Sequence, residues 1–125
     1  MKQSEDALAG ETESCSVSQY QTRGATVVTV TGAVDALTAP MVHTVLDEAL
    51  SSSPPVLVVD LLQVDFLASA GMSVLVAVRE AMPVSSRFAI VADGPATSRP
   101  LTVIGVAELV ELYPRLDAAL DALTA

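Results

Sequence analysis

Apolar residues along this chain follow two spacings, which alternate from one segment to the next. Unbroken apolar or β-branched runs are typical of buried strands. Such runs lie at residues 26–31 and 56–59, and stretches that are apolar in part predict further strands at residues 87–91 and 108–112. Residues 16–23 alternate more weakly, and a turn at Gly24 joins them to the first run as a hairpin.

Between the strands, apolar residues recur at the i, i+3, i+4, i+7 spacing of helices that bury one face. These helices are predicted at residues 38–50, 69–82, 97–104 and 114–123. The first begins at Thr38, with Pro40 in its first turn, where the missing N–H of proline costs nothing. The third ends at Gly105, a residue type that favours the conformation after a helix.

This order of elements predicts one α/β domain. An opening hairpin followed by alternating helices and strands implies a mixed sheet of about five strands with about four helices. We assign residues 15–125 to this domain, and residues 1–14, which are polar and acidic, to a disordered tail. The ends of the strands then place Asp35, Ser69 and Gly94 at one edge of the sheet, where α/β proteins usually have their sites.

The helix predicted at residues 69–82 has two different faces. The face assigned to the core carries Gly71, Val74, Leu75, Val78, Ala81 and Met82. The opposite face carries Ser69, Met72, Ser73, Val76 and Glu80. A solvated face is normally rich in charged residues, so we expect another element of the domain, or a partner, to cover this one.

The charge of the chain excludes two classes of ligand. Six basic and fifteen acidic residues leave a net charge of −9, which nucleic acids and anionic lipids repel. No apolar run reaches the roughly 18 residues of a membrane span, and the beginning of the chain is too acidic for a signal peptide. We therefore expect a cytoplasmic protein that binds neither nucleic acid nor membrane.

Few residues suit catalysis or metal binding. Ser69 stands at a strand-to-helix turn, as the nucleophile of G-x-S-x-G hydrolases does, but the first glycine of that motif is missing. The only histidine, His43, has no evident carboxylate to orient it. No spacing resembles a metal site or a glycine-rich phosphate loop. We expect no enzymatic activity, no metal and no cofactor.

The single cysteine, Cys15, excludes an intramolecular disulfide and a zinc site built from cysteines. It precedes the first strand in a polar segment, so we interpret it as an incidental thiol near a mobile end of the chain. An intermolecular disulfide or redox sensing is the alternative.

Two roles of Ser69 stay open from the residues alone. Serine is a preferred N-cap residue, which favours a capping role. A phosphate on Ser69 would lie at the positive end of the helix dipole, where an anion is stabilised by about 0.3 to 1 kcal/mol. It would also change the charge beside Met72 and Val76 by nearly −2, enough to switch a contact with a partner.

Two blocks of sequence carry a resemblance that is specific when both are present. Residues 32–40, GAVDALTAP, match the pattern G-x-[hydrophobic]-D-x-x-[ST]-[AV]-P, and residues 60–71, DLLQVDFLASAG, match D-L-x-x-V-x-F-[hydrophobic]-D-S-[STA]-G in most positions. Both blocks, in this order, resemble the STAS domains of bacterial anti-sigma factor antagonists. The likeness extends over residues 16–120 and implies a STAS-like fold.

The resemblance implies a binding protein of a partner-switching system that regulates transcription under stress. In this family the unmodified domain docks on an anti-sigma factor, usually also a serine kinase, and so frees a sigma factor. The kinase phosphorylates the serine matching Ser69, which ends binding, and a phosphatase restores it; ATP and Mg²⁺ belong to the kinase. The partner-binding residues implied are Asp35, Ala68, Ser69, Met72, Ser73 and Val76. We expect a monomer or a weak homodimer.

One position departs from the family pattern. Ala68 stands where the family commonly has an aspartate before the serine. If that aspartate assists the kinase, Ser69 is a poor substrate. The alternative function is therefore a STAS scaffold subunit of a signalling or transport assembly, regulated without phosphorylation, in which Ser69 only caps the helix.

Overall fold

The computed structural model of the protein describes residues 7–124, with side chains from Gly10 onward. Its elements in chain order are β1 (Ala7–Glu11), β2 (Cys15–Thr22), β3 (Ala25–Val34), α1 (Ala39–Ser51), β4 (Val56–Leu67), α2 (Ser69–Ala81), β5 (Arg87–Val91), α3 (Ser98–Val103), the 3-10 turn η2 (Val106–Glu108), β6 (Glu111–Tyr113) and α4 (Leu116–Thr124). Within this part of the chain, every helix is too short or too polar to cross a bilayer.

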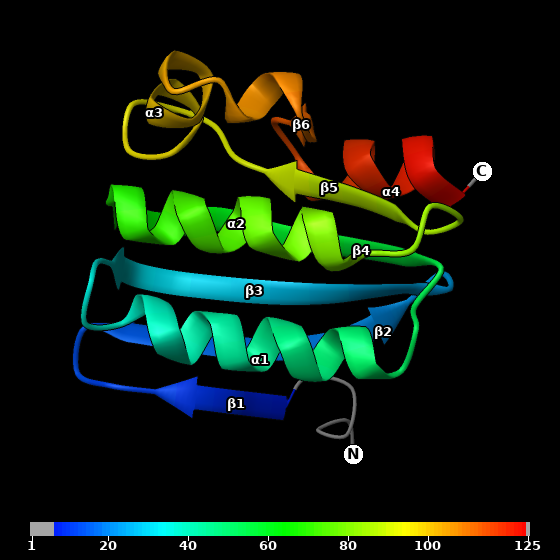
Figure 1. Ribbon diagram of the computed structural model, residues 1–125, viewed down its shortest axis with the longest axis horizontal. Coiled ribbons are helices and arrows are strands. Elements are labelled where there is room, and N and C mark those ends of the chain that lie inside the picture. Colours follow the sequence, from blue (N-terminus) through cyan, green and yellow to red (C-terminus); the bar gives the residue numbers. More distant parts are fainter. Residues whose placement is uncertain (1–6, 125) are drawn as a thin grey trace.

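The six strands form one sheet whose spatial order is the same as their order in the chain, β1 to β6 (Figure 1). The first three strands are antiparallel, and β3 to β6 are parallel. The predicted mixed sheet is confirmed, with six strands in place of about five.

The extra strand, β1, lies in the segment predicted to be a disordered tail. The Thr12 hydroxyl accepts hydrogen bonds from the N–H groups of Ser14 and Cys15, and the Thr12 N–H donates to the Cys15 carbonyl at 2.7 Å. This tight turn reverses the chain, so that β1 pairs with β2 in antiparallel orientation. The pairing is made by backbone hydrogen bonds, and these do not require alternating apolar residues in the sequence. Residues 1–6 of the expected tail lie outside the described residues.

Helices cover both faces of the sheet. Helices α1 and α2 lie side by side on one face (Figure 1), and α4 packs against β4, β5 and β6 on the other. Along β4, Leu57 and Val59 belong to the core under α1 and α2, whereas Val56 and Val58 belong to the core under α4. This alternation confirms a strand buried on both faces.

Strand β4 is longer than predicted, since it runs to Leu67 and not to residue 59. The second half buries Leu61, Val64 and Leu67, which are three residues apart, while the residues between them are exposed. Two register shifts in the pairing with β3 cause this spacing, because each adds a residue to β4. A period of three is neither that of a strand nor that of a helix, so the sequence pattern does not reveal this half.

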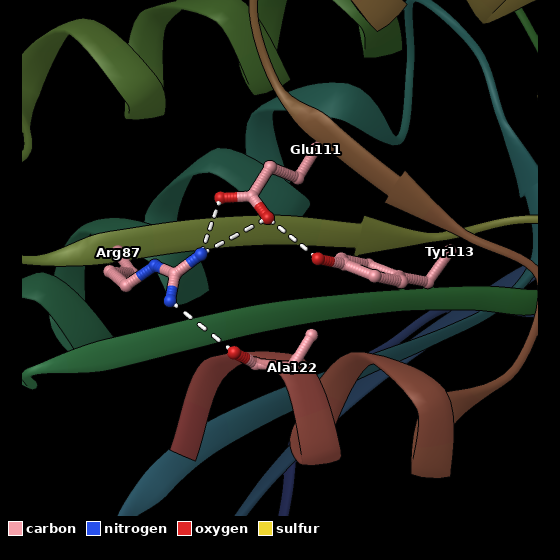
Figure 2. A network of polar contacts seen from close by, with 4 residues as sticks. All are labelled: Arg87, Glu111, Tyr113 and Ala122. Carbon is pink, nitrogen blue, oxygen red and sulfur yellow. Dashed lines mark hydrogen bonds and ion pairs between the residues drawn. The ribbon is translucent and has the colours of Figure 1, made fainter. Parts of the chain in front are cut away.

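A polar cluster fastens β6 and α4 at the start of β5 (Figure 2). Arg87 donates to both carboxylate oxygens of Glu111 at 3.0 and 3.2 Å and to the Ala122 carbonyl at 3.3 Å. The Tyr113 hydroxyl donates to Glu111 at 2.6 Å, and it and Arg87 hold the pKa of Glu111 below its usual value. The cluster thus ties the first residue of β5 to β6 and to the end of α4.

Candidate functional site

The carboxyl ends of β3, β4 and β5 meet at one edge of the sheet, at the left of Figure 1. The loop with Asp35 follows β3, Ser69 follows β4, and the turn with Gly94 follows β5. The predicted convergence at one edge is therefore confirmed. Beyond β4, the Ala68 N–H donates to the Val34 carbonyl at 2.9 Å, so the Asp35 loop and the start of α2 are direct neighbours.

Asp35 shapes its own loop. Its carboxylate accepts hydrogen bonds from the N–H groups of Leu37 and Thr38 at 2.9 and 3.0 Å and from the Thr38 hydroxyl at 3.2 Å. These bonds, the Thr38 N–H foremost, hold the pKa of Asp35 below its usual value. Thr38 stands at the N-cap position of α1, but its hydroxyl donates back to the Ala33 carbonyl instead of capping the helix.

Ser69 is the first residue of α2, and its side chain is exposed. Ala68, with an extended backbone, occupies the N-cap position, and no side chain caps the helix. The interpretation of Ser69 as the N-cap is therefore wrong. It fails because the helix begins at Ser69 itself, one residue earlier than a cap at Ser69 requires. The hydroxyl of Ser69 is left facing solvent at the positive end of a 13-residue helix.

Close packing holds the start of α2 against the sheet. Gly71 lies so near the ends of β3 and β4 that a Cβ atom there would be 2.6 Å from Val34 Cγ1 and 2.8 Å from Leu67 Cδ1. Because Val34 and Leu67 are both buried, glycine allows an approach that no larger residue permits. The position of Ser69, two residues earlier, is tied to this contact.

A groove of about 350 Å³ lies along the outer flank of α2. Four residues predicted for partner binding line it: Ser69, Met72, Ser73 and Val76. Met72 is only 7% exposed, so the prediction that it lies on an outer face needs correction: it belongs to the core and also lines the groove. At the other end of α2, Glu80 lines the same groove.

The opposite wall of the groove comes from residues 104–109, which sequence reasoning did not assign to the site. Ile104, Val106 and Leu109 line this wall. Gly105 turns the chain there with φ of +94°, and its N–H donates to the Thr102 carbonyl, as predicted for a residue that ends a helix. This segment is the element of the same domain that partly covers the outer face of α2.

Two of the predicted partner-binding residues do not line the groove. Ala68 directly precedes α2, and Asp35 lies in the neighbouring loop between β3 and α1. The six residues thus form two adjoining parts, a groove and a loop, joined at Ser69.

Catalytic and metal chemistry has little support in the described residues. His43 Nε2 lies 3.6 Å from Asp47 Oδ1 one turn along α1, so the expectation that no carboxylate stands near it is wrong, but both residues belong to α1 and neither lines the groove with Ser69. Among residues 7–124, no group of three or more His, Cys, Asp and Glu side chains could hold a metal ion.

Cys15 differs from its prediction, because it is the first residue of β2 and only 3% exposed. Burial raises the pKa of its thiol, which disfavours the reactive thiolate. The sequence predicted a thiol near a mobile end; the pairing of Cys15 with Gly32 places it in the core instead.

Comparisons with known proteins show the family to which this chain belongs. The model of the STAS domain family matches residues 16–119. The chain belongs to the STAS family. The anti-sigma-F factor antagonist RsfB of Mycobacterium tuberculosis, from strains CDC 1551 and H37Rv, is 32% identical over 108 residues, which cover 86% of this chain and 88% of RsfB.

Solved structures show the same STAS fold. The crystal structure of an anti-sigma factor antagonist from Mycobacterium paratuberculosis superposes with a TM-score of 0.88 and 37% identity, and covers 93% of this chain and 99% of that one. The anti-sigma factor antagonist SpoIIAA, in its unphosphorylated form, superposes with a TM-score of 0.67 over 85% of this chain and 95% of its own, but at 16% identity it supports the fold alone.

Proposed function

We propose that this STAS domain is an anti-sigma factor antagonist, which binds an anti-sigma factor and thereby frees a sigma factor for transcription in the cytoplasm. The observation that carries the proposal is the exposed Ser69 at the joint of a groove and a loop, in a chain whose relatives are named anti-sigma factor antagonists. An anti-sigma-F factor is the partner class that the name of RsfB suggests.

Phosphorylation of Ser69 is the proposed control. The Ser69 hydroxyl is exposed, and no hydrogen bond from it to another described residue competes with transfer of a phosphoryl group from ATP held by the partner kinase. The phosphate would be stabilised at the start of α2 by about 0.3 to 1 kcal/mol. The same doubly charged group would stand at the rim of an apolar groove, where a docked partner would have to desolvate it. A phosphatase would reverse the change.

Variants of Ser69 test the switch. Binding of the purified anti-sigma factor by calorimetry should be lost in Ser69→Glu and kept in Ser69→Ala. Ser85→Glu is the matched control for charge, since Ser85 is exposed after α2 and does not line the groove. Equal affinities of Ser69→Glu and Ser69→Ala would refute the switch. Phosphopeptide mass spectrometry after incubation with the anti-sigma kinase tests the modification itself.

Ala68 favours a second candidate, a STAS scaffold regulated without phosphorylation. Ala68 gives α2 no capping side chain, whereas an aspartate at this position would have the extended backbone of an N-cap and an oxygen to bond the N–H groups of the first turn. Helix capping would therefore account for the aspartate that the family commonly has at the position of Ala68, as would recognition by the kinase. Phosphorylation of Ser69 in the native chain, with Ala68 in place, would exclude the scaffold.

A further inference from the structure

The groove beside α2 extends well beyond Ser69. Ser69, Ser73, Val76 and Glu80 line it at the spacing of one helical face. Because Glu80 follows Ser69 by eleven residues in one helix, the two ends of the groove are about 16 Å apart. The proposed phosphorylation of Ser69 gives a function to one end of the groove only, so the function of the other end is still to be explained.

The middle of the groove is apolar and open. The wall opposite α2 exposes 57% of Ile104 and 47% of Leu109, which are large hydrophobic side chains that face the groove together. The wall is fastened to α2, because Arg79 Nε donates to the Leu109 carbonyl at 2.6 Å. The groove is therefore preformed, which lowers the cost of filling it.

The far end of the groove is acidic. Glu80 lines it, Glu108 is exposed in the wall segment, and neither forms an ion pair in the part of the chain that the structure describes. The neighbouring cation, Arg79, donates to the Leu109 carbonyl and does not line the groove, so its charge offsets only one of the two carboxylates. With a net charge of −9 on the whole chain, a basic occupant is favoured here.

We propose that this groove receives a basic, apolar segment of the anti-sigma factor. An apolar side chain of that segment packs between Val76, Ile104 and Leu109, and an adjacent lysine or arginine pairs with Glu80. The inference rests on the proposed function, since the groove is continuous at Ser69 with the proposed docking surface.

The two ends of the groove contribute independently. Their separation of about 16 Å exceeds the Debye length, which is about 8 Å at physiological ionic strength. A phosphate on Ser69 therefore acts locally on the contact at that end, while Glu80 adds affinity and attraction at the other.

Two pairs of matched variants test the proposal against purified anti-sigma-F factor from the same organism. Glu80→Lys is compared with Glu48→Lys, which makes the same change of net charge on the exposed face of α1. Leu109→Ser is compared with Leu62→Ser, because Leu62 is 43% exposed on β4 and lies outside the groove. Ile104→Ser is a second wall variant, and thermal unfolding of every variant verifies its fold.

The groove variants should weaken binding about tenfold or more, as buried contacts at interface centres do, while both control variants bind like the wild type. The loss in Glu80→Lys should shrink at high salt and that in Leu109→Ser should not. If all three groove variants bind the anti-sigma factor as tightly as the wild type, the proposed docking in the groove is refuted and the proposed function stands. A wild type that does not bind would overturn both.

A second copy of this chain is the competing occupant. Sedimentation of the protein alone decides it: a dimer that Leu109→Ser dissociates, with anti-sigma binding intact, would overturn the proposed occupant.

Discussion

Replacing Gly71 by alanine tests whether close packing at the start of α2 fixes the position of the candidate site. The change adds one methyl group at the joint of β3, β4 and α2. It alters no charge and no hydrogen bond, so its effect reports on packing and helix propensity alone.

Helix propensity and core packing change the free energy of unfolding in opposite directions in this variant. Alanine is more favourable than glycine inside a helix by about 1 kcal/mol. Against this, the new Cβ would lie 2.6 Å from Val34 Cγ1 and 2.8 Å from Leu67 Cδ1, far inside ordinary van der Waals contact. Overpacking of a core costs about 1 to 3 kcal/mol. Val34 is buried and β-branched, so it cannot rotate away, and the upper half of that range applies. We expect a net loss of about 1 to 2 kcal/mol.

Urea unfolding followed by circular dichroism measures this loss. Ser73→Ala is the control, because it changes helix propensity at an exposed position of the same helix and should raise stability by less than about 0.7 kcal/mol. The double variant Gly71→Ala/Val34→Ala removes the overlap with Val34 Cγ1, the closer of the two, and should lose less stability than the sum of the two single variants. A Gly71→Ala protein as stable as the wild type would refute the packing argument.

Three further predictions concern the same edge of the sheet. Ala68→Asp should raise the free energy of unfolding by about 1 kcal/mol, because α2 lacks a capping side chain; no gain in urea unfolding would contradict the N-cap geometry. The lowered pKa of Asp35 means that its ionised form stabilises the fold above about pH 3.9, the unfolded value, and that this stabilisation is lost as the pH falls through the folded pKa. Asp35→Asn should accordingly be less stable than the wild type at pH 6, by a margin that shrinks toward pH 3, whereas a constant margin would disagree with the hydrogen bonds of the loop. Cys15, buried and with a raised pKa, should react with iodoacetamide far more slowly in the native protein than in urea; equal rates would restore the redox interpretation.

Many of the elements could be predicted because their patterns depend on near neighbours in the chain. The predicted strand at residues 87–91 coincides with β5, since an apolar run of that length next to a turn has one stable environment, a buried strand. The helix begun by Thr38 and Pro40 and the turn at Gly105 follow from backbone preferences that need no tertiary partner. The order of these elements then implies the shared edge of Asp35, Ser69 and Gly94.

The tertiary structure decided what depends on contacts between distant segments. The pairing of β1 with β2 made a strand from a segment without an apolar period, and two register shifts carried β4 to Leu67. The groove needs α2 and residues 104–109 together, and no local pattern links them. By itself, the sequence determined most of the elements, their order and the serine at the joint. Only packing decided that Ser69 does not cap its helix and that an apolar groove with an acidic end lies beside it, because both depend on where residues far apart in the chain come to rest.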